Sequence, residues 1–396
     1  MFDSMFGGLS NCLWHNCARS FYNVPPERRR RTRRRYSMVR MKQLMRAILL
    51  TLLLAAAVHA ENAVVVAGGG TGGDGSPATQ AKLTKPFAVA FDKAGNLYIA
   101  EMEGGERILR VDSKGVLTTL AGTGKKGSSG DGGPAAQAEF NGMHNILIAP
   151  DDTLYVADSW NNRIRKIDLK SGVITAFAGT GVKGFSGDDG PALKAEFSGV
   201  FCIAMDAKGE TLYVDDIDNR RVRAIDMKTG IVRTIAGNGE KGVPADGSDA
   251  KTSPLVDPRA IAVDSKGNLY LLERGGNALR VIGTDGKIRT VAGTGKAGAS
   301  GDGGPALQAT MKGPKHICVD ADDNVLIADT DNHVIRKFNP KDGTMSHLAG
   351  TGTPGPAGAG GPLEKLQLNQ PHGVYVHAGV LYISDAYNNR VLKTER

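Results

Sequence analysis

The sequence predicts an all-β fold built from six similar units, and three observations carry this prediction. A short hydrophobic run ends in Ala-Gly-X-Gly six times, at spacings of 54, 57, 58, 56 and 57 residues. Each of the first five units contains four short apolar or alternating segments separated by turn residues. A strand-like segment also precedes the first unit, whereas the last unit has only three such segments. The repeated motifs begin at Ala67, Ala121, Ala178, Ala236, Ala292 and Ala349.

The second unit shows the pattern expected of one antiparallel sheet. Its four strands are expected at residues 146–148, 154–157, 163–167 and 173–177, with turns between them. The third segment alternates Ile with Arg or Lys, which is typical of a strand exposed on one face. Four antiparallel strands per unit, repeated six times, indicate a six-bladed β-propeller.

Loops rich in Gly, Asp and Pro separate the fourth strand of one unit from the first strand of the next. Close copies occur at residues 127–138, 186–192 and 300–306. Glycine allows tight turns there, and the proline in each copy suits the start of a one-turn helix. Such loops can bind phosphate or calcium, but each copy offers only one or two carboxylates. We therefore interpret these loops as structural turns.

The two ends of the repeat array predict how the ring closes. The last unit has strand-like segments at residues 373–376, 381–384 and 390–393, and no fourth. A matching segment, Ala-Val-Val-Val-Ala-Gly, occupies residues 63–68. We expect this N-terminal strand to complete the C-terminal blade, because the pairing covers two sheet edges that would otherwise be exposed.

The positive charge of the chain is concentrated at its N-terminus. The formal net charge is +8, but the first 60 residues hold 11 Lys/Arg and 2 Asp/Glu, which leaves 38 basic and 39 acidic residues in the rest. Nucleic-acid binding requires a basic surface. We therefore expect no nucleic-acid partner for residues 61–396.

Residues 41–60 have the pattern of a secretory signal peptide. Lys42 and Arg46 precede an apolar run at residues 47–58, and a small residue, Ala60, ends a suitable cleavage site. Twelve apolar residues are too few to span a bilayer, so we expect no stable membrane anchor. We expect an exported protein, periplasmic or extracellular, whose mature form begins at Glu61. Residues 1–40 are interpreted as an over-called start or a disordered basic extension, or as a carrier of a twin-arginine export element.

Two cysteines remain in the part of the chain after the signal. Cys202 and Cys318 lie in different units and are expected to be buried small residues whose side chains face opposite ways. No disulfide is expected between them.

The units resemble NHL repeats. The matching elements are Gly-Asn-Leu-Tyr-Ile-Ala at residues 95–100, Asp-Ser-Trp-Asn-Asn-Arg-Ile at 158–164 and Asp-Ala-Tyr-Asn-Asn-Arg-Val at 385–391. The resemblance covers residues 63–396 and is strongest to exported bacterial NHL-repeat proteins and to the propeller of teneurins. It implies a β-propeller, but the family includes adhesion modules, RNA-binding platforms and a few enzymes, so it implies no single activity.

Candidate binding residues come from the positions that do not repeat. In a propeller the first strands line the central channel, and ligands usually bind where the blade tops meet it. The residue at the start of each first strand differs between units, which distinguishes it from the scaffold. In blade order these residues are Phe87, His144, Phe201, Arg259, Lys315 and His372. Their cationic and aromatic side chains predict an anion site for a carboxylate, phosphate or sulfated sugar, or else a plug of the channel.

Two enzyme families offer an alternative use of the same channel. The peptide-amidating lyase resembles this chain, and its three zinc-ligating His follow Pro at strand starts. Here His372 follows Pro, His144 partly matches, and Arg259 holds the third alternate position, where a guanidinium cannot ligate zinc. His316, one residue further along its strand, is expected to face the other way. Gluconolactonase-type enzymes bind a divalent metal through acidic channel residues, and none of the six strand-start residues is acidic.

Other conspicuous residues are interpreted as scaffold or rim. Recurring carboxylates that end the second strands, followed by Asn, are expected to cap turns. Arginines near the third strands are expected on solvated faces. Trp160 and Tyr387 occupy equivalent turns and could contact a sugar or protein. The carboxylates are Glu101, Asp158, Asp216, Glu273, Asp329 and Asp385; the arginines are Arg163, Arg165, Arg220, Arg223, Arg336 and Arg390.

The sequence thus favours an exported, monomeric, non-catalytic propeller. It would bind a protein, a glycan or a small anionic ligand at the channel mouth and loops, without a cofactor. The histidine contribution to anion binding should fade as the pH rises through ~6.5, the ordinary pKa of imidazole. The alternative is a metal-dependent hydrolase or lyase, lactonase-like or amidating-lyase-like, with zinc or calcium held by His144 and His372.

Overall fold

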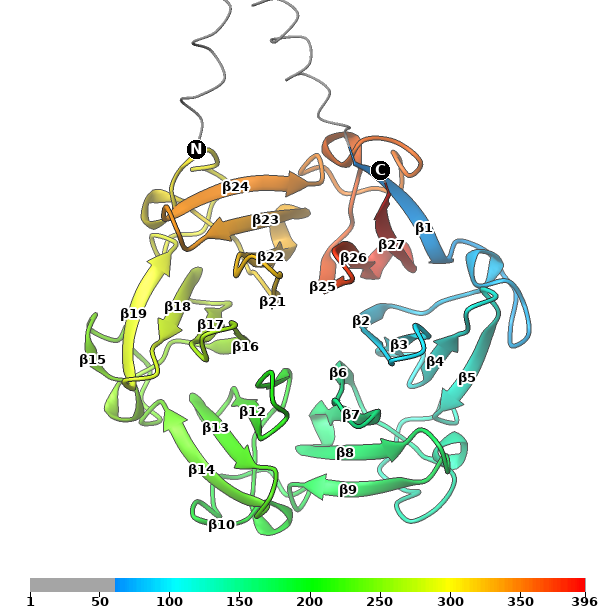
Figure 1. Cartoon of the computed structure of the whole chain (residues 1–396), viewed down its shortest axis with the longest axis horizontal. Coiled ribbons are helices and arrows are strands. Elements are labelled where there is room, and N and C mark those ends of the chain that lie inside the picture. The colour runs from blue at the N-terminus through cyan, green and yellow to red at the C-terminus, as the bar shows by residue number, and fades with distance from the viewer. Residues whose placement is uncertain (1–60, 396) are drawn as a thin grey trace, which may run out of the picture. The chain divides into compact units, whose positions relative to one another are not determined.

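Six antiparallel sheets are arranged in a ring in the computed structural model, which describes residues 61–395 (Figure 1). The all-β, six-bladed propeller is confirmed. Each blade has four main strands, and three blades add a two-residue strand at the outer edge. The described residues belong to one compact unit. The expected signal peptide and the extension before it lie outside the described residues.

The first three blades follow one another in sequence, with the first strand of each nearest the centre (Figure 1). Their strands are, for blade 1, β2 (Pro86–Phe91), β3 (Leu97–Glu101), β4 (Ile108–Val111) and β5 (Leu117–Ala121); for blade 2, β6 (Met143–Ile148), β7 (Thr153–Asp158), β8 (Arg163–Asp168) and β9 (Ile174–Ala178); for blade 3, β11 (Ile203–Met205), β12 (Thr211–Asp216), β13 (Arg221–Asp226) and β14 (Ile231–Ala236), with β10 (Gly190–Pro191) at its edge.

The remaining blades repeat this order. Their strands are, for blade 4, β16 (Pro258–Val263), β17 (Leu269–Glu273), β18 (Ala278–Ile282) and β19 (Lys287–Ala292), with β15 (Ser248–Asp249) at the edge; for blade 5, β21 (His316–Val319), β22 (Val325–Asp329), β23 (Val334–Asn339) and β24 (Thr344–Ala349), with β20 (Gly304–Pro305); for blade 6, β25 (Pro371–His377), β26 (Val380–Asp385), β27 (Arg390–Glu395) and β1 (Asn62–Gly68).

The ring closes through the N-terminal strand, as predicted. Strand β1 pairs antiparallel with β27, from Asn62 opposite Glu395 to Gly68 opposite Arg390. The sheet order of blade 6 is β1-β27-β26-β25. The two ends of the described chain therefore share one sheet, and β1 covers the edge that β27 would otherwise leave unpaired.

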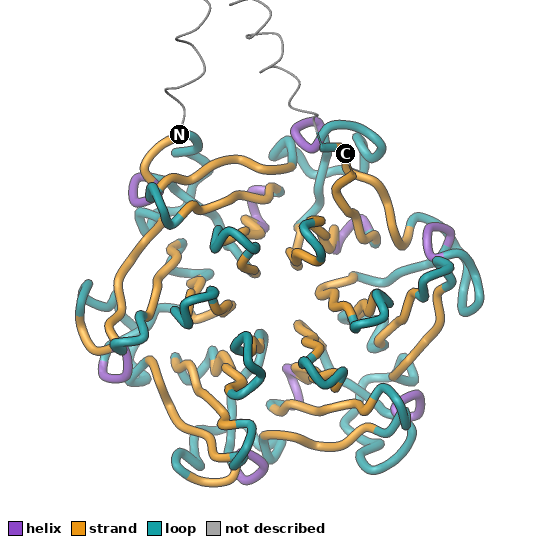
Figure 2. The backbone as a smooth tube through the Cα atoms, in the orientation of Figure 1, coloured by secondary structure: helices purple, strands orange, loops and turns teal. Residues whose placement is uncertain are grey.

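Short 3₁₀ helices follow the loops between blades and lie on the outer rim (Figure 2). Pro134, Pro191 and Pro305 occupy the N-cap, just before the helices that the sequence analysis expected. The outer helices are η2 (Ala78–Gln80), η3 (Ala135–Gln137), η5 (Ala192–Lys194), η6 (Ala250–Thr252), η7 (Ala306–Gln308) and η9 (Leu363–Lys365); three more follow second strands, η4 (Ser159–Asn161), η8 (Thr330–Asn332) and η10 (Ala386–Asn388).

The hydrophobic core lies between neighbouring sheets and repeats around the ring. After each outer helix one apolar side chain inserts beneath the next blade and is at most 3% exposed. Burying one such side chain contributes about 1.5–3 kcal/mol. The equivalent residues are Leu83, Phe140, Phe197, Leu255, Met311 and Leu368.

The prediction of solvated arginine faces on the third strands is wrong. Arg165 and Arg223 are fully buried, and Arg336 is 1% exposed, because the Gly-rich loop folds over this face. Nε of Arg165 donates to Asp131 at 2.9 Å, and its other nitrogens donate to the carbonyl oxygens of Glu139 and Ser129. Arg390 is also buried, whereas Arg163 is partly exposed and Arg220 lies in the turn before β13.

The recurring carboxylates cap turns, as predicted. Asp158, fully buried, accepts hydrogen bonds from the backbone N of Asn141 at 2.9 Å and from the Asn161 side chain at 2.9 Å. Asp385 repeats the arrangement in blade 6 with Asn369 and Asn388. The carboxylates, the arginines and the loops thus form a structural network that repeats around the ring.

Candidate functional site

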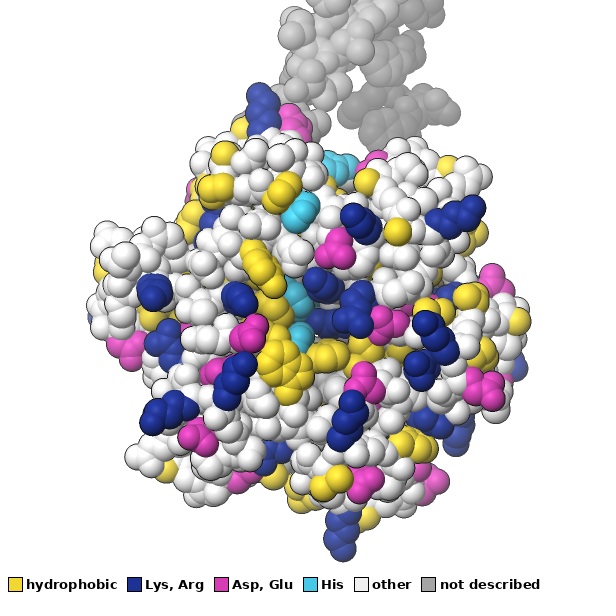
Figure 3. Space-filling view, turned by 180° about the vertical axis from the view of Figure 1, so that it is seen from behind, with side chains coloured by type: hydrophobic (Ala, Val, Ile, Leu, Met, Phe, Trp, Pro, Cys, Tyr) yellow, Lys and Arg dark blue, Asp and Glu magenta, His cyan; other side chains and the backbone are white. Residues whose placement is uncertain are grey.

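Four of the six strand-start residues enter the channel through β-bulges. The register of the first strand shifts at Phe87, His144, Arg259 and His372, so that each is an extra residue between two paired neighbours. A bulge leaves the inserted residue unpaired and redirects its side chain. Histidine and basic side chains, together with hydrophobic ones, gather at the centre of one face of the ring (Figure 3).

The aromatic members of this set contact one another around the axis. The ring of His372 stacks on Phe87 at a centroid distance of 3.6 Å, and Phe87 meets His144 at 5.4 Å. His144 packs against Phe201 at 4.2 Å, and the guanidinium carbon of Arg259 lies 4.8 Å from the centre of the Phe201 ring. Five of the six predicted residues therefore form one contact group, which we call the mouth cluster.

Lys315 lies beside the mouth cluster, with its side chain 21% exposed. Its Nζ lies 3.6 Å from Oδ1 of Asp331, on the turn after β22. Burial, and after it the charge of nearby Arg259 among other causes, lowers the pKa of the lysine. Lys315 thus adds a partly neutralised positive charge to the mouth.

The contact with Arg259 determines which ring nitrogen of His372 carries the proton. Its Nε2 lies 3.1 Å from Nη2 of Arg259, and a guanidinium can only donate, so Nε2 must accept. The proton of the neutral imidazole is then on Nδ1. That Nδ1 is buried and has no hydrogen-bond partner among the described residues. An unsatisfied buried donor is costly, which makes it a position for an acceptor from a ligand.

His144 takes the same tautomer for a different reason. Its Nδ1 lies 2.7 Å from the carbonyl oxygen of Gly142, which can only accept, so Nδ1 carries the proton. Burial, then the charge of Arg259, lowers the pKa of both His144 and His372 well below the ordinary value. Both rings are therefore neutral near pH 6.5. The expectation that anion binding fades as the pH rises through ~6.5 is therefore wrong for these two histidines, because neither loses a proton at that pH.

Arg259 carries the charge of the mouth cluster. It is 2% exposed, and within residues 61–395 no carboxylate lies at ion-pairing distance from it. Burial lowers its pKa to about 10, so it remains a cation at neutral pH. Buried charges are normally paired, because desolvation of a lone ion is expensive. An unpaired guanidinium lining a channel can donate charge-assisted hydrogen bonds to an oxyanion.

Two carboxylates act on Arg259 electrostatically from a distance, Asp215 most strongly and Asp257 less so. Asp215 lies in blade 3, near the end of the second strand. It is fully buried, and its Oδ1 accepts from the backbone N of Phe201 at 2.8 Å and of Cys202 at 2.6 Å. Its Oδ2 has no partner among the described residues. Burial raises its pKa well above the ordinary value, so it neutralises Arg259 incompletely. The sequence showed this carboxylate only as one extra acid in blade 3, without a partner.

The donor set of the mouth does not suit a divalent metal. The rings of His144 and His372 are 5.7 Å apart, and the guanidinium of Arg259 occupies Nε2 of His372. A cation at this place would be repelled by Arg259. Within residues 61–395 no group of three or more His, Cys, Asp or Glu side chains is arranged to hold a metal ion.

The expectation that His316 faces away from the channel is wrong. Its Nε2 lies 3.1 Å from Nδ2 of Asn145, which belongs to blade 2 across the axis, and its Nδ1 lies 3.3 Å from the backbone N of Val374. Strand β21 begins only at His316 and pairs with β22 without a bulge, so Lys315 lies outside the regular strand and strict alternation does not extend to it. Asn145 was missed in the sequence because it directly follows the bulge residue His144, which breaks alternation in β6.

Aromatic side chains lie on the rim next to the mouth cluster. Trp160 is 40% exposed, and its ring centroid is 6.0 Å from that of His144. It covers Gly142, where a β-carbon would collide with the indole. Tyr387, at the equivalent turn of blade 6, is 48% exposed beneath Nζ of Lys85. The mouth therefore combines a buried cation with flat apolar surfaces.

Two family models match the chain. A model of the teneurin NHL domain matches residues 30–130, and a model of the NHL repeat matches residues 368–393. No helix within residues 61–395 is long and apolar enough to cross a membrane.

Curated relatives and solved structures agree with these matches. NHL repeat-containing protein 2 of Gallus gallus is 26% identical over 342 residues, which cover 77% of this chain and 46% of that protein. Teneurin-1 of Gallus gallus is 32% identical over 267 residues, covering 59% of this chain and 10% of teneurin-1. The chain thus spans less than half the length of these relatives. An auxiliary nutrient-binding protein of Bacteroides thetaiotaomicron superposes with a TM-score of 0.61 at 15% identity, covering 85% of this chain and 76% of that one.

Proposed function

Because this chain is an NHL-repeat β-propeller with a cationic channel mouth, we propose that it is an exported, non-catalytic binding protein for a small oxyanion. The anion binds Arg259 at the mouth, and a carboxylate is the preferred class of anion. One observation carries the proposal: Arg259 is 98% buried and lacks a carboxylate partner among the described residues.

The neighbouring groups support the same ligand chemistry. The unpartnered Nδ1–H of His372 can donate to an oxygen of the anion, and Lys315 adds charge at the entrance. Phe87 and Phe201 offer apolar walls, and Trp160 offers an exposed ring on which a flat or sugar-like body can stack. The preferred ligand is therefore a carboxylate on a flat or ring-shaped body.

Binding is favoured over acid catalysis by the environment of the mouth. Burial lowers the pKa of both histidines of the mouth cluster and keeps them neutral, so neither holds a proton to give as an imidazolium acid. Export is supported by the pattern of residues 41–60, which lies outside the described residues.

The test is a titration calorimetry screen with four probes: benzoate, glucuronate, inorganic phosphate and a sulfated monosaccharide. We expect at least one probe to bind the parent protein, and Arg259→Gln to weaken every hit about tenfold or more, because charge-assisted hydrogen bonds contribute about 1.5–3 kcal/mol each. Arg289→Gln is the matched control, since Arg289 is exposed on the outer strand β19 of the same blade.

Two results would contradict the proposal. Equal binding of every hit by Arg259→Gln and the parent would place the site outside the channel. A stoichiometric tightly bound metal in the purified protein, whose removal by a chelator abolishes binding, would favour the hydrolase or lyase alternative.

A further inference from the structure

A cavity occupies the end of the channel opposite the mouth cluster. It encloses about 520 Å³, within the usual range for small-molecule sites. It is lined by the ends of the first strands and the turns that follow them, whereas the mouth cluster lies at the strand starts. The mouth cluster contributes no residue to its wall. We call it the far cavity.

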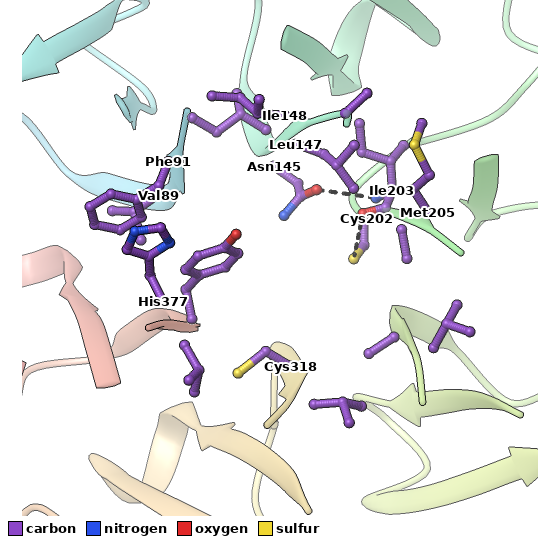
Figure 4. Close-up of a pocket in the computed structure, with 18 of the residues that line it drawn as sticks. Val89, Phe91, Asn145, Leu147, Ile148, Cys202, Ile203, Met205, Cys318 and His377 are labelled. Atoms are coloured by element: carbon purple, nitrogen blue, oxygen red, sulfur yellow. Dashed lines mark hydrogen bonds between the residues drawn. The ribbon is translucent and has the colours of Figure 1, made fainter. Parts of the chain in front are cut away.

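The wall of the far cavity is apolar and partly aromatic. Phe91 stacks on His377 with ring centroids 4.2 Å apart, and the ring of Tyr375 lies 6.0 Å from Phe91. Figure 4 shows this aromatic side opposite Ile203 and Met205. Aromatic rings and a polarisable thioether together suit a flat aromatic guest.

Polar side chains line the floor of the far cavity, which is its end nearest to the mouth cluster. Cys202, Asn145 and His316 all line the cavity, and the contact between Asn145 and His316 crosses the channel at 3.1 Å. Cys318 lines it too, so the two cysteines face the same cavity rather than opposite ways, and both are free. The floor separates the far cavity from the mouth cluster.

The charges at the far rim are opposite in sign to those of the mouth. Three aspartates line the cavity, Asp92, Asp152 and Asp206, against one lysine, Lys93. These carboxylates hold the strand-connecting turns; Oδ1 of Asp92, for example, accepts from the backbone N of Asn96 at 2.8 Å. Although burial acts in the other direction, hydrogen bonds from Asn96 keep the pKa of Asp92 below its ordinary value. The rim therefore stays negative at neutral pH.

We propose that the far cavity is a second binding site, which takes a small aromatic molecule carrying a positive charge. The ring of the guest packs against Phe91 and Tyr375, and its cation faces the aspartate rim. A cation also gains from the faces of aromatic rings. The site is independent of the anion site at the mouth, so that the channel binds opposite charges at its two ends.

The test uses three probes that share one ring system and differ in charge: tryptamine, indole and indole-3-acetate. Each is titrated by ligand-observed NMR at about pH 8, where an ordinary histidine is neutral, against the full chain. Met205→Trp narrows the cavity from a partly exposed position. Asp152→Asn removes one rim charge, and its positive φ of 64° is tolerated by Asn.

We expect tryptamine to bind with a dissociation constant on the order of 1 mM or tighter. Met205→Trp should weaken tryptamine at least about tenfold. Asp152→Asn should weaken tryptamine about two- to fivefold at low salt and leave indole unchanged. Asp285→Asn is the matched control, because Asp285 also accepts a backbone N–H in an exposed turn but does not line the cavity.

Either of two results overturns the proposal. One is that no probe shows binding that responds to Met205→Trp or to Asp152→Asn. The other is that indole-3-acetate loses as much affinity as tryptamine in these variants, because the site would then not select a cation. If Met205→Trp fails to fold, the effect of Asp152→Asn on the affinities of tryptamine and indole tests the proposal alone.

Discussion

Arg259 shows what a single residue in the sequence could and could not reveal. Its position was predictable, because alignment of the six units isolates the residues that do not repeat. Its contact with His372 was not, since the β-bulge that aims it depends on sheet register. The neutrality of His144 and His372 was also hidden, because burial by neighbouring blades lowers their pKa.

His316 provides a prediction at this scale about acid stability. Burial, then the charge of Arg259, lowers its pKa to about 4. An unfolded histidine binds its proton near pH 6.5, so the unfolded state holds more protons between about pH 6.5 and 4. The histidine therefore stabilises the folded protein fully above about pH 6.5, and this contribution is lost as the pH falls to about 4. The loss is at most roughly 3 kcal/mol.

The measurement is the difference in unfolding free energy between the parent and His316→Gln, from urea titrations at several pH values. We expect the advantage of the parent to shrink as the pH drops from about 7 to 4. Groups with the opposite sign, such as Asp216 and Asp329 with pKa values raised to about 6 by burial, are present in both proteins and cancel. A difference that stays constant over this range would show that His316 does not titrate as described.

At the scale of the element, the Gly-rich loops are part of a repeated structural network. The sequence predicts that the loops and the recurring carboxylates are structural, which the hydrogen bonds bear out. The prediction for Arg165 is wrong, because alternation of Ile with Arg predicts an open face and cannot reveal a loop that folds over it. Asp131 of the loop binds this arginine instead of an ion.

Arg165→Met tests this network. The change removes the guanidinium that donates to Asp131 and to the backbone carbonyl oxygens of Glu139 and Ser129, whereas Asp158 keeps Arg163 at 3.2 Å. Hydrogen bonds that involve a charged group contribute about 1.5–3 kcal/mol each. Thermal melting should show a clear drop. Lys166→Ala is the control, because Lys166 is the exposed neighbour on the same strand and should change stability by about 0.5 kcal/mol or less. Equal melting temperatures for the two variants would mean that the network is not stabilising.

At the scale of the whole molecule, ring closure was predictable because the segment before the first unit carries the same Ala-Gly ending as the fourth strands. The pairing of β1 with β27 joins the two ends of the described chain. Repeat proteins depend on contacts between neighbouring units, so an open blade weakens both of its neighbours.

A truncation tests this closure. A protein that begins at Gly70 lacks β1, and it should melt at a lower temperature or aggregate, because its blade 6 exposes an unpaired edge at β27. A protein that begins at Glu61 keeps β1 and is the control. If both forms are monomeric and melt alike, β1 does not hold the ring closed.

The central claim is that the channel mouth holds an oxyanion on Arg259. The most direct measurement is a crystal structure of the protein with the tightest-binding anion of the screen. We predict that the anion contacts the guanidinium of Arg259 and accepts from Nδ1 of His372, beside Phe87 and Phe201. An anion bound on the outer surface of the ring, with the mouth cluster unoccupied, would contradict the claim.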